Sequence, residues 1–156
     1  MQRHGPAGGA RGRHHPNLTE AALLLGQPYE TLPAGEAGLR EITERLSLGG
    51  RRSVVLTGAS LAPGRTGAVC FDARTGKTEA VQTAYVAHEF HGTGDVFSSV
   101  LTGALVRGES LSSAAGEAAA FVRACAERTA AEDLPMREGV DFEPLLGLLI
   151  PGKETV

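Results

Sequence analysis

The chain has 156 residues and a formal net charge of −3, and 42% of its residues are hydrophobic while 21% are charged. This length and balance are typical of one globular domain with a hydrophobic core, and the small charge without a long basic run argues against a nucleic-acid partner. No apolar segment reaches the ~20 residues that span a bilayer, and the N-terminus lacks the apolar stretch of a signal peptide, so we expect a cytoplasmic protein with no membrane partner.

The first 15 residues differ from the rest of the chain. Apart from Met1 they contain no aliphatic residue larger than alanine, so they cannot contribute to a core. We therefore expect a disordered basic tail over residues 1–15 and a folded domain over residues 16–156. Histidines at positions 4, 14 and 15 have no cysteine beside them, and a solvated tail explains them better than a metal site.

A short helix is marked at both ends between Asn17 and Gly26. Asn17 is a preferred N-cap residue, and Glu20 stands three residues later, where a capping box needs its carboxylate. The same amide and carboxylate are also suited to Mg²⁺, a hard cation that prefers oxygen ligands. The pattern leaves both interpretations open.

Residues 35–47 predict a second helix, because apolar residues recur there at helical spacing. The next element, Ser53–Gly58, is a β-branched apolar run that ends in small residues. Such a run predicts a buried parallel strand whose C-terminal end, at Thr57 and Gly58, faces a ligand crevice. A strand that merely turns at the glycine would have the same sequence.

The second half of the chain alternates between strand and helix patterns. Residues 67–72 and 77–86 read as a hairpin that turns at Gly76; the neighbouring Arg74–Thr78 resembles the end of a P-loop but lacks the earlier glycine. Two helices follow, one with an apolar face from residue 96 to 105 and one beginning at Ser110, and then a short terminal element over residues 140–146.

The two cysteines, Cys70 and Cys125, are far apart in the sequence and show no CxxC spacing. A metal site or a redox motif would need closely spaced partners. We expect both residues to be buried, reduced thiols without a chemical role.

The most informative segment is His91–Phe97, in which two glycines bracket Thr93 and a carboxylate follows at once. Gly92 and Gly94 let the backbone approach a ligand closely, and the first N–H groups of the helix that begins here point outward, which suits a phosphate. Asp95 inside such a turn makes sense as a base that takes the proton of an attacking hydroxyl. Alternatively, Asp95 only caps the helix.

Four blocks together resemble the C-terminal half of the bacterial pyridoxal (pyridoxamine) kinases of the ribokinase superfamily. They occur in the family's order and cover almost everything after residue 15. The blocks are Pro16–Ala21, Val54–Gly58, His91–Ser99 and Arg137–Glu143. Their order and separation are more specific than any one of them.

The resemblance implies a three-layer α/β fold, present here only as the C-terminal half of the sheet with its helices. It also implies that ATP donates its γ-phosphoryl group to the 5′-hydroxyl of pyridoxal, pyridoxamine or pyridoxine. In the family's pattern, Asp95 matches the catalytic base, and the backbone of Gly92, Thr93 and Gly94 matches the anion hole. Asn17 and Glu20 match the family's element that organises Mg²⁺. Thr57 and Gly58 match a strand end that lies beside the nucleotide in the family.

The main departure from the family lies before residue 16. There the family has an apolar strand and a whole half that carries the vitamer pocket, whereas this chain has Ala10–His15. We therefore expect a weakly active or inactive chain, because a kinase must hold both reactants in line. Two alternative functions stay open: a non-catalytic nucleotide-binding or interaction module, and a relative of the hydroxymethylpyrimidine kinases. A homodimer also stays open as the assembly of the chain.

Overall fold

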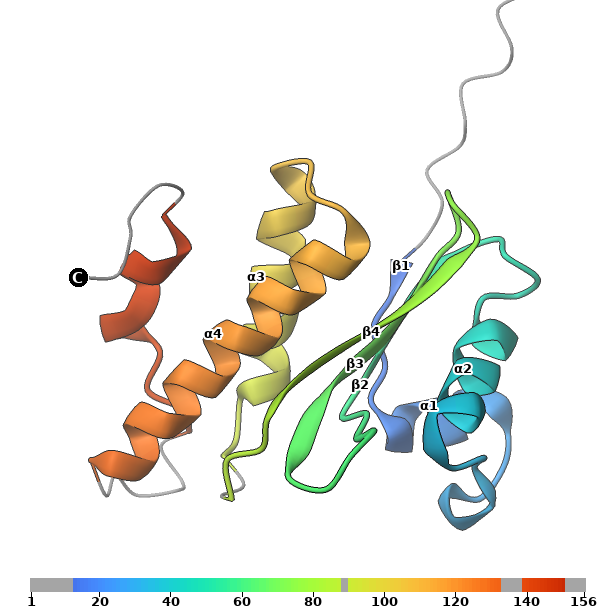
Figure 1. The fold of residues 1–156 in the computed structure, drawn as a ribbon, viewed down its shortest axis with the longest axis horizontal. Helices are drawn as coiled ribbons and strands as arrows, with labels where there is room; N and C mark the ends of the chain where they lie inside the picture. The colour runs from blue at the N-terminus through green and yellow to red at the C-terminus, as the bar shows by residue number, and fades with distance from the viewer. Residues whose placement is uncertain (1–12, 88–89, 133–138, 151–156) are drawn as a thin grey trace, which may run out of the picture.

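A four-stranded sheet lies between two pairs of helices in the computed structural model, which describes residues 13–87, 90–132 and 139–150 (Figure 1). Helices α1 and α2 cover one face of the sheet, and α3 and α4 cover the other. This is the expected three-layer α/β arrangement. Within the described ranges, no helix combines the length and the apolar character that crossing a membrane requires.

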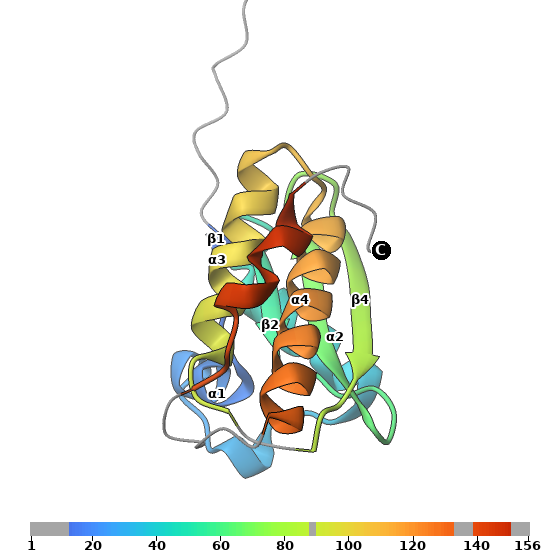
Figure 2. The same cartoon turned by 90° about the vertical axis from the view of Figure 1, so that its left-hand side faces the viewer.

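The elements follow the sequence predictions closely from residue 17 onward. In chain order they are β1 (Arg13–His14), α1 (Leu18–Leu25), the 3₁₀ helix η1 (Tyr29–Thr31), α2 (Gly35–Leu46), β2 (Ser53–Thr57), β3 (Arg65–Asp72), β4 (Lys77–Ala84), α3 (Thr93–Val106), α4 (Leu111–Ala131) and the 3₁₀ helix η3 (Glu143–Leu149). Figure 2 shows η3 lying across the outer side of α3 and α4.

The expected disorder of residues 1–15 is wrong at its C-terminal end. Arg13 and His14 form β1 and pair in parallel with Ser53 and Val54 of β2. The edge of β2 has backbone N–H and C=O groups that need hydrogen-bond partners, so even a polar dipeptide pairs there as a strand. The first 12 residues of the predicted tail lie outside the described residues.

The sheet has the order β1-β2-β3-β4, in which β2 runs parallel to β1 and antiparallel to β3, and β3 and β4 form the predicted hairpin. Strand β2 is interior, and its side chains are buried on both faces. Val54 and Leu56 pack under α1 and α2, whereas Val55 packs under α3 and α4. Burying one such side chain contributes about 1.5–3 kcal/mol, which explains the continuous apolar run.

Helix α4 packs closely on β3 and β4 through small side chains. The alanines that recur along this face are almost fully buried: Ala114, Ala115 and Ala118. Helix α3 lies beside α4 on the same face and adds Phe97 and Leu101 to this core. The position of the α3 N-terminus is therefore fixed by packing along the whole helix.

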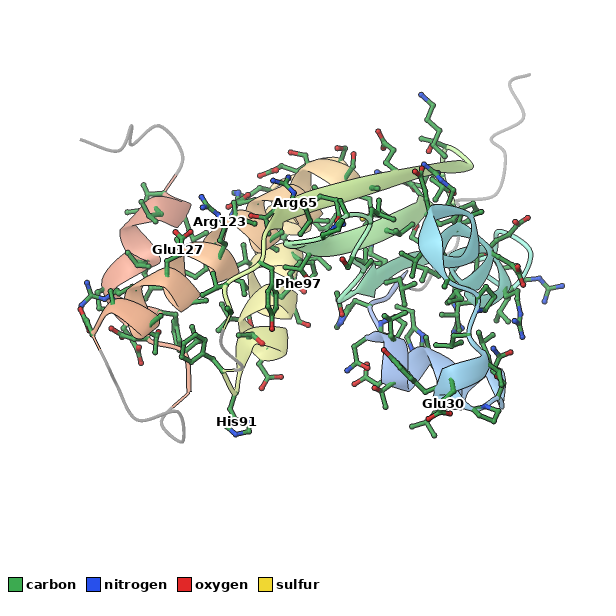
Figure 3. The ribbon with its side chains drawn as sticks, turned by 60° about the horizontal axis from the view of Figure 1, so that its bottom comes forward. Glu30, Arg65, His91, Phe97, Arg123 and Glu127 are labelled. Carbon is green, nitrogen blue, oxygen red and sulfur yellow. The ribbon has the colours of Figure 1, made fainter. Side chains whose placement is uncertain are left out.

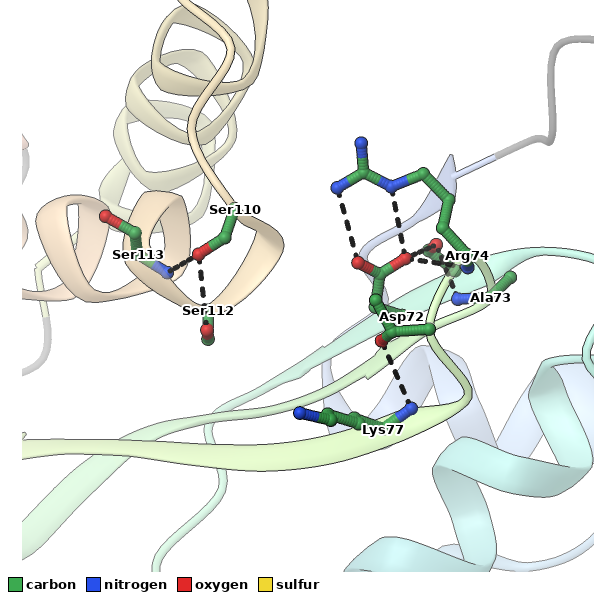
Figure 4. Close-up of polar contacts among 9 residues, drawn as sticks. Asp72, Ala73, Arg74, Lys77, Ser110, Ser112 and Ser113 are labelled. Atoms are coloured by element: carbon green, nitrogen blue, oxygen red, sulfur yellow. Dashed lines mark hydrogen bonds and ion pairs between the residues drawn. The ribbon is translucent and has the colours of Figure 1, made fainter.

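The β3–β4 turn is organised by one buried carboxylate, shown in Figure 4. Asp72 Oδ1 accepts a hydrogen bond from the Arg74 backbone N–H at 2.9 Å and one from Ser53 Oγ at 3.4 Å. The Gly76 N–H donates to the Asp72 carbonyl at 2.7 Å, and Gly76 has a φ of 70° that favours glycine. Gly76 closes a hairpin, as predicted, and not a P-loop.

These contacts also set the ionisation of Asp72. Burial alone raises the pKa of a carboxyl, but the backbone N–H of Arg74, its guanidinium and the Ser53 hydroxyl together hold the pKa of Asp72 below its ordinary value. The contribution to stability is thus present above the unfolded-state pKa of about 4 and is lost as the pH falls through the lower folded-state pKa.

Asp72→Asn is expected to lower the free energy of unfolding at pH 7 by about 1 kcal/mol, because hydrogen bonds to a charged acceptor are weakened. The difference from the wild type should shrink as the pH falls from about 4 through the lower folded-state pKa, because the wild-type carboxyl is then protonated as well. Urea unfolding between pH 2.5 and pH 7 measures this, with the exposed Glu30→Gln as the control. A difference that does not change with pH would contradict the assignment.

Candidate active site

A cleft of about 690 Å³ opens at the edge of the sheet where β1, β2 and β4 end. The N-terminal turn of α3 and one side of α4 complete its wall. Gly92 is the one predicted site residue outside the lining of the cleft. The other predicted site residues, which are up to 78 positions apart in the sequence, all line it: Asn17, Glu20, Thr57, Gly58, Thr93, Gly94 and Asp95.

The turn before α3 has the expected conformation. Gly92 is the N-cap residue with a φ of 82°, a left-handed conformation that favours glycine. The first helical hydrogen bond runs from Val96 N–H to the Gly92 carbonyl at 3.0 Å, so the N–H groups of the preceding residues have no helical acceptor. A Cβ on Gly94 would meet no atom within 4 Å, which means that this residue faces open space. The turn therefore has backbone N–H groups without helical acceptors next to open space, and its role as an anion site stays a prediction.

Asp95 is the third residue of α3 and is exposed at the cleft. The prediction that it lies within one turn of a helix N-terminus is confirmed. Its carbonyl accepts a hydrogen bond from Ser99 Oγ at 2.8 Å. Within the described part of the chain, its carboxylate has no hydrogen-bond partner and caps no backbone group. The carboxylate is therefore available to a ligand.

Asn17 and Glu20 form a complete capping box at the start of α1. The Glu20 N–H donates to Asn17 Oδ1 at 2.9 Å, and the Asn17 N–H donates to Glu20 Oε2 at 3.0 Å. The interpretation of this pair as a capping box is confirmed. Both side chains are exposed at the cleft, and the cap engages only one of the two Glu20 carboxylate oxygens.

The donor set fits Mg²⁺ held jointly with phosphates better than a site built from protein alone. No group of three or more His, Cys, Asp or Glu side chains suited to a metal ion exists among the described residues. Mg²⁺ commonly takes one or two carboxylates and fills its other positions with water and substrate phosphates. Metal ligation by Asn17 and Glu20 stays a prediction.

The chain after β1 is tied to the end of β2. The Thr57 N–H donates to the Pro16 carbonyl at 2.9 Å, and Asn17 forms a parallel bridge with Thr57. Gly58 then turns the chain with a φ of 72°. These contacts place the capping box directly beside the strand end, so the first two sequence blocks form one wall of the cleft.

Sequence reasoning missed several residues of the cleft. His15 was assigned to the tail, yet its Nδ1 lies 3.2 Å from Ser98 Oγ, one turn beyond Asp95. Val122 and Arg123 belong to the helix that is predicted to begin at Ser110, and both line the cleft, while Tyr85 borders it just past the end of β4. No local pattern marks these residues. The pairing of β1 with β2 brings His15 to the site, and the packing of α4 on β4 brings Val122, Arg123 and Tyr85 there.

Three of the residues considered in the sequence analysis, Cys70, Cys125 and Gly92, lie outside the lining of the cleft. Burial raises the pKa of Cys70 to about 12 and that of Cys125 to about 11, so both thiols stay protonated at neutral pH as expected. Gly92 lines a second cavity of about 450 Å³ between α3, α4 and η3. Figure 3 shows His91, which borders this cavity too, projecting away from the helices.

Residues 15–139 match the family model described as phosphomethylpyrimidine kinase. A search of curated proteins found no match. Among solved structures, a protein from Bacteroides thetaiotaomicron assigned as a phosphomethylpyrimidine kinase has a TM-score of 0.80 at 29% identity, with 91% of this chain and 49% of that chain covered. A second crystal form of it, with pyridoxal, has a TM-score of 0.79 at 31% identity, with 88% and 48% covered.

Two pyridoxal kinases of known structure are also similar to this chain. The enzyme from Lactobacillus plantarum has a TM-score of 0.73 at 28% identity, with 88% of this chain and 48% of that chain covered. An ADP complex of Bacillus subtilis pyridoxal kinase has a TM-score of 0.60 at 25% identity, with 72% and 43% covered. This chain therefore spans about half the length, or less, of the structures that it matches.

Proposed function

Because the chain belongs to the phosphomethylpyrimidine kinase family and has part of the ribokinase-like fold, we propose that it forms the nucleotide-binding half of an ATP-dependent kinase for the 5′-hydroxyl of a B6 vitamer. The substrates are pyridoxal, pyridoxamine or pyridoxine. The observation that carries the proposal is the cleft that Thr93, Gly94 and Asp95 line together with Asn17 and Glu20.

The turn supplies the anion hole of the proposed reaction. The N–H groups at the start of α3 have no helical acceptor, and they lie at the positive end of the helix dipole. Donors that are fixed in place before the reaction stabilise charge that develops on the phosphoryl oxygens. The backbone of Gly92, Thr93 and Gly94 takes this role.

Asp95 acts as the base. Its carboxylate is exposed beside the anion hole and is not engaged by the described part of the chain, so it can accept the proton of the vitamer hydroxyl as that oxygen attacks phosphorus. A carboxylate so close to the phosphate would only repel it in a simple binding site. Its position supports a kinase over a non-catalytic nucleotide-binding module.

The other parts of the cleft suit the rest of ATP. Asn17 and Glu20 would hold Mg²⁺, which would neutralise phosphate charge. Tyr85, Val86 and Val122 give the cleft an apolar region that suits a purine base, and Thr57 and Gly58 lie between this region and the capping box at the strand end.

Two findings favour different substrate rings. The pyridoxal in a crystal form of the Bacteroides thetaiotaomicron protein supports a pyridine substrate. The family model supports the alternative, a kinase for a hydroxymethylpyrimidine. Both substrates carry a hydroxymethyl group on a six-membered nitrogen ring, so the chemistry of Asp95 is the same for either.

Gly94→Val is expected to weaken the binding of Mg-ATP at least tenfold, because a branched side chain would occupy the space that the phosphates take. Gly103→Val is the matched control, since it makes the same change in the same helix outside the cleft. Titration calorimetry measures both variants. Equal affinities of the wild type and Gly94→Val would reject the anion site.

Glu20→Gln distinguishes the proposed role of Glu20 in metal binding from its role in the capping box. Glutamine still closes a capping box, so the free energy of unfolding should change by less than about 0.5 kcal/mol. The loss of the charge should nevertheless reduce the gain in ATP affinity that Mg²⁺ brings. Titrations with and without Mg²⁺ measure this gain, and a gain as large as in the wild type would remove Glu20 from the metal site.

Asp95→Asn tests the proposed base. The variant is made in this chain after fusion to the half of the Bacteroides thetaiotaomicron kinase that lies outside the match. Asparagine is nearly isosteric but cannot accept the proton, so the turnover of pyridoxal should fall ~10²–10⁴-fold while most of the nucleotide affinity remains. The 156-residue chain alone should show little turnover, because half of the positioning surface is lacking. Undiminished turnover in Asp95→Asn would contradict the role of Asp95.

A further inference from the structure

The turn before α3 lacks the side-chain cap that fixes the starts of α1 and α4. Asn17 caps α1, and Ser110 Oγ accepts the Ser113 N–H at 3.1 Å at the start of α4. Gly92, the N-cap residue of α3, has no side chain for this purpose, and Gly94 follows in the first turn of the helix. Glycines leave the backbone many conformations, so a turn built on them gains order from contacts outside it.

Residues 139–141 contact the backbone directly before this turn. The Val140 N–H donates a hydrogen bond to the His91 carbonyl at 3.1 Å, and the Val140 side chain is buried in the core beside α3 and α4. Gly139 lies against the same carbonyl. Its φ is 81°, and a Cβ at this position would lie 3.1 Å from the His91 carbonyl oxygen, which is closer than most contacts of a Cβ atom.

The last turn of α4 holds these residues from the other side. The Asp141 N–H donates to Thr129 Oγ1 at 2.9 Å, and Arg128 Nε donates to Asp141 Oδ2 at 2.9 Å. Thr129 is buried, and its single hydroxyl proton is donated to the Cys125 carbonyl at 2.8 Å. A lone pair of the hydroxyl oxygen therefore accepts the Asp141 N–H. Residues 139–141 are thus fixed between α4 and the turn.

One peptide group carries this constraint into the turn. His91 and Gly92 are joined by a trans peptide, which is planar and has its C=O and N–H pointing in opposite directions. Because the His91 carbonyl is held toward Val140, the Gly92 N–H is directed away from Val140. Gly92 then leads into α3 with a φ of 82°, so the directions of the next N–H groups depend on the same peptide.

We propose, on the basis of the proposed function, that residues 139–141 position the anion hole through the peptide group between His91 and Gly92. Thr129 and Gly139 are the positioning residues. Neither lines the cleft, so they act on the backbone of the turn and not by contact with ATP. Thr129 holds the Asp141 N–H, and Gly139 lets the two backbones approach closely. Donors that are held in place in advance stabilise phosphoryl charge most effectively.

Thr129→Val and Thr43→Val form a matched pair that tests Thr129 in the full chain. Both threonines are buried in a helix, and both donate to the carbonyl four residues earlier, which is Cys125 for Thr129 and Leu39 for Thr43. Both variants should therefore lose similar amounts of stability. Only Thr129→Val also removes the acceptor of the Asp141 N–H.

NMR spectroscopy without ligand measures the effect on the turn. In Thr129→Val, hydrogen exchange of the Val140 amide should accelerate about tenfold more than in Thr43→Val, because its segment is released from α4. The amide resonances of Gly92 and Gly94 should shift in the same variant. Thr129→Ser keeps the hydroxyl and should resemble the wild type.

Gly139→Ala and Gly108→Ala give a second matched pair. Both glycines have a positive φ, 81° and 93°, so alanine is strained at either position. A Cβ at Gly108 meets nothing within 4 Å, whereas a Cβ at Gly139 displaces the His91 carbonyl. Only Gly139→Ala should shift the resonances of the turn. Titration calorimetry should show Mg-ATP affinity lowered about fivefold in Gly139→Ala and Thr129→Val, and unchanged in both controls.

The outcomes separate this inference from the proposed function. Unshifted resonances of Gly92 and Gly94 in both Thr129→Val and Gly139→Ala overturn the inference, and so do equal shifts in the control variants. If the wild type binds Mg-ATP and these two variants bind it with the same affinity, the inference is wrong and the proposed function stands. A wild-type chain that does not bind Mg-ATP rejects the proposed function, and with it the inference.

Discussion

The cleft depends on the parallel pairing of β1 with β2. Because these strands run in the same direction, the segments that follow them leave the sheet at the same edge. The 2.9 Å hydrogen bond from Thr57 N–H to the Pro16 carbonyl extends this pairing past the last residue of β1. Asn17 is thereby held against Thr57, and α1 starts at the cleft. This contact, together with the packing of α1 on α2 and β2, fixes the capping box relative to the end of β2.

The opposite wall is positioned by packing and not by strand pairing. Helix α3 enters the core along its length, through Phe97 near its start and Leu101 and Ala104 further on. Its N-terminal turn projects beyond the packed part, where Gly92 adopts a conformation that other residues rarely take. A rigid helix thus carries a turn that is open to ligands. This combination suits a site whose donors must be in place before the ligand arrives.

Much of this architecture could be predicted from local sequence. Asn17 and Glu20 specify the start of α1, Gly76 specifies the hairpin, and the glycines around Thr93 specify the turn before α3, because each depends on backbone geometry within a few residues. Strand β1 could not be predicted in this way. Arg13 and His14 have no strand pattern, and they become a strand because β2 offers an unpaired edge.

The residues that complete the cleft were missed for a related reason. Val122 belongs to the apolar pattern of α4, and that pattern does not distinguish a residue facing the sheet from one facing a cleft. Tyr85 lies just past β4, where only the antiparallel register of the hairpin brings it to the same edge as Thr57. Such information is carried by tertiary contacts, so it becomes visible only with the fold.

The charges of the cleft explain why its two walls must act together. Glu20 lies on one wall and Asp95 on the other, and both are exposed to the ligand, while Arg123 adds one positive charge from α4. A polyphosphate that enters this space meets more protein carboxylates than cations, so the protein alone opposes its charge. Under the proposed function, ATP would therefore need a cation shared between its phosphates and Glu20, and the α3 N–H groups would attract the remaining negative charge. Glu20 takes part in the capping box, whereas the Asp95 carboxylate has no partner among the described residues, and the proposed role of Asp95 as a base requires a carboxylate that is free in this way.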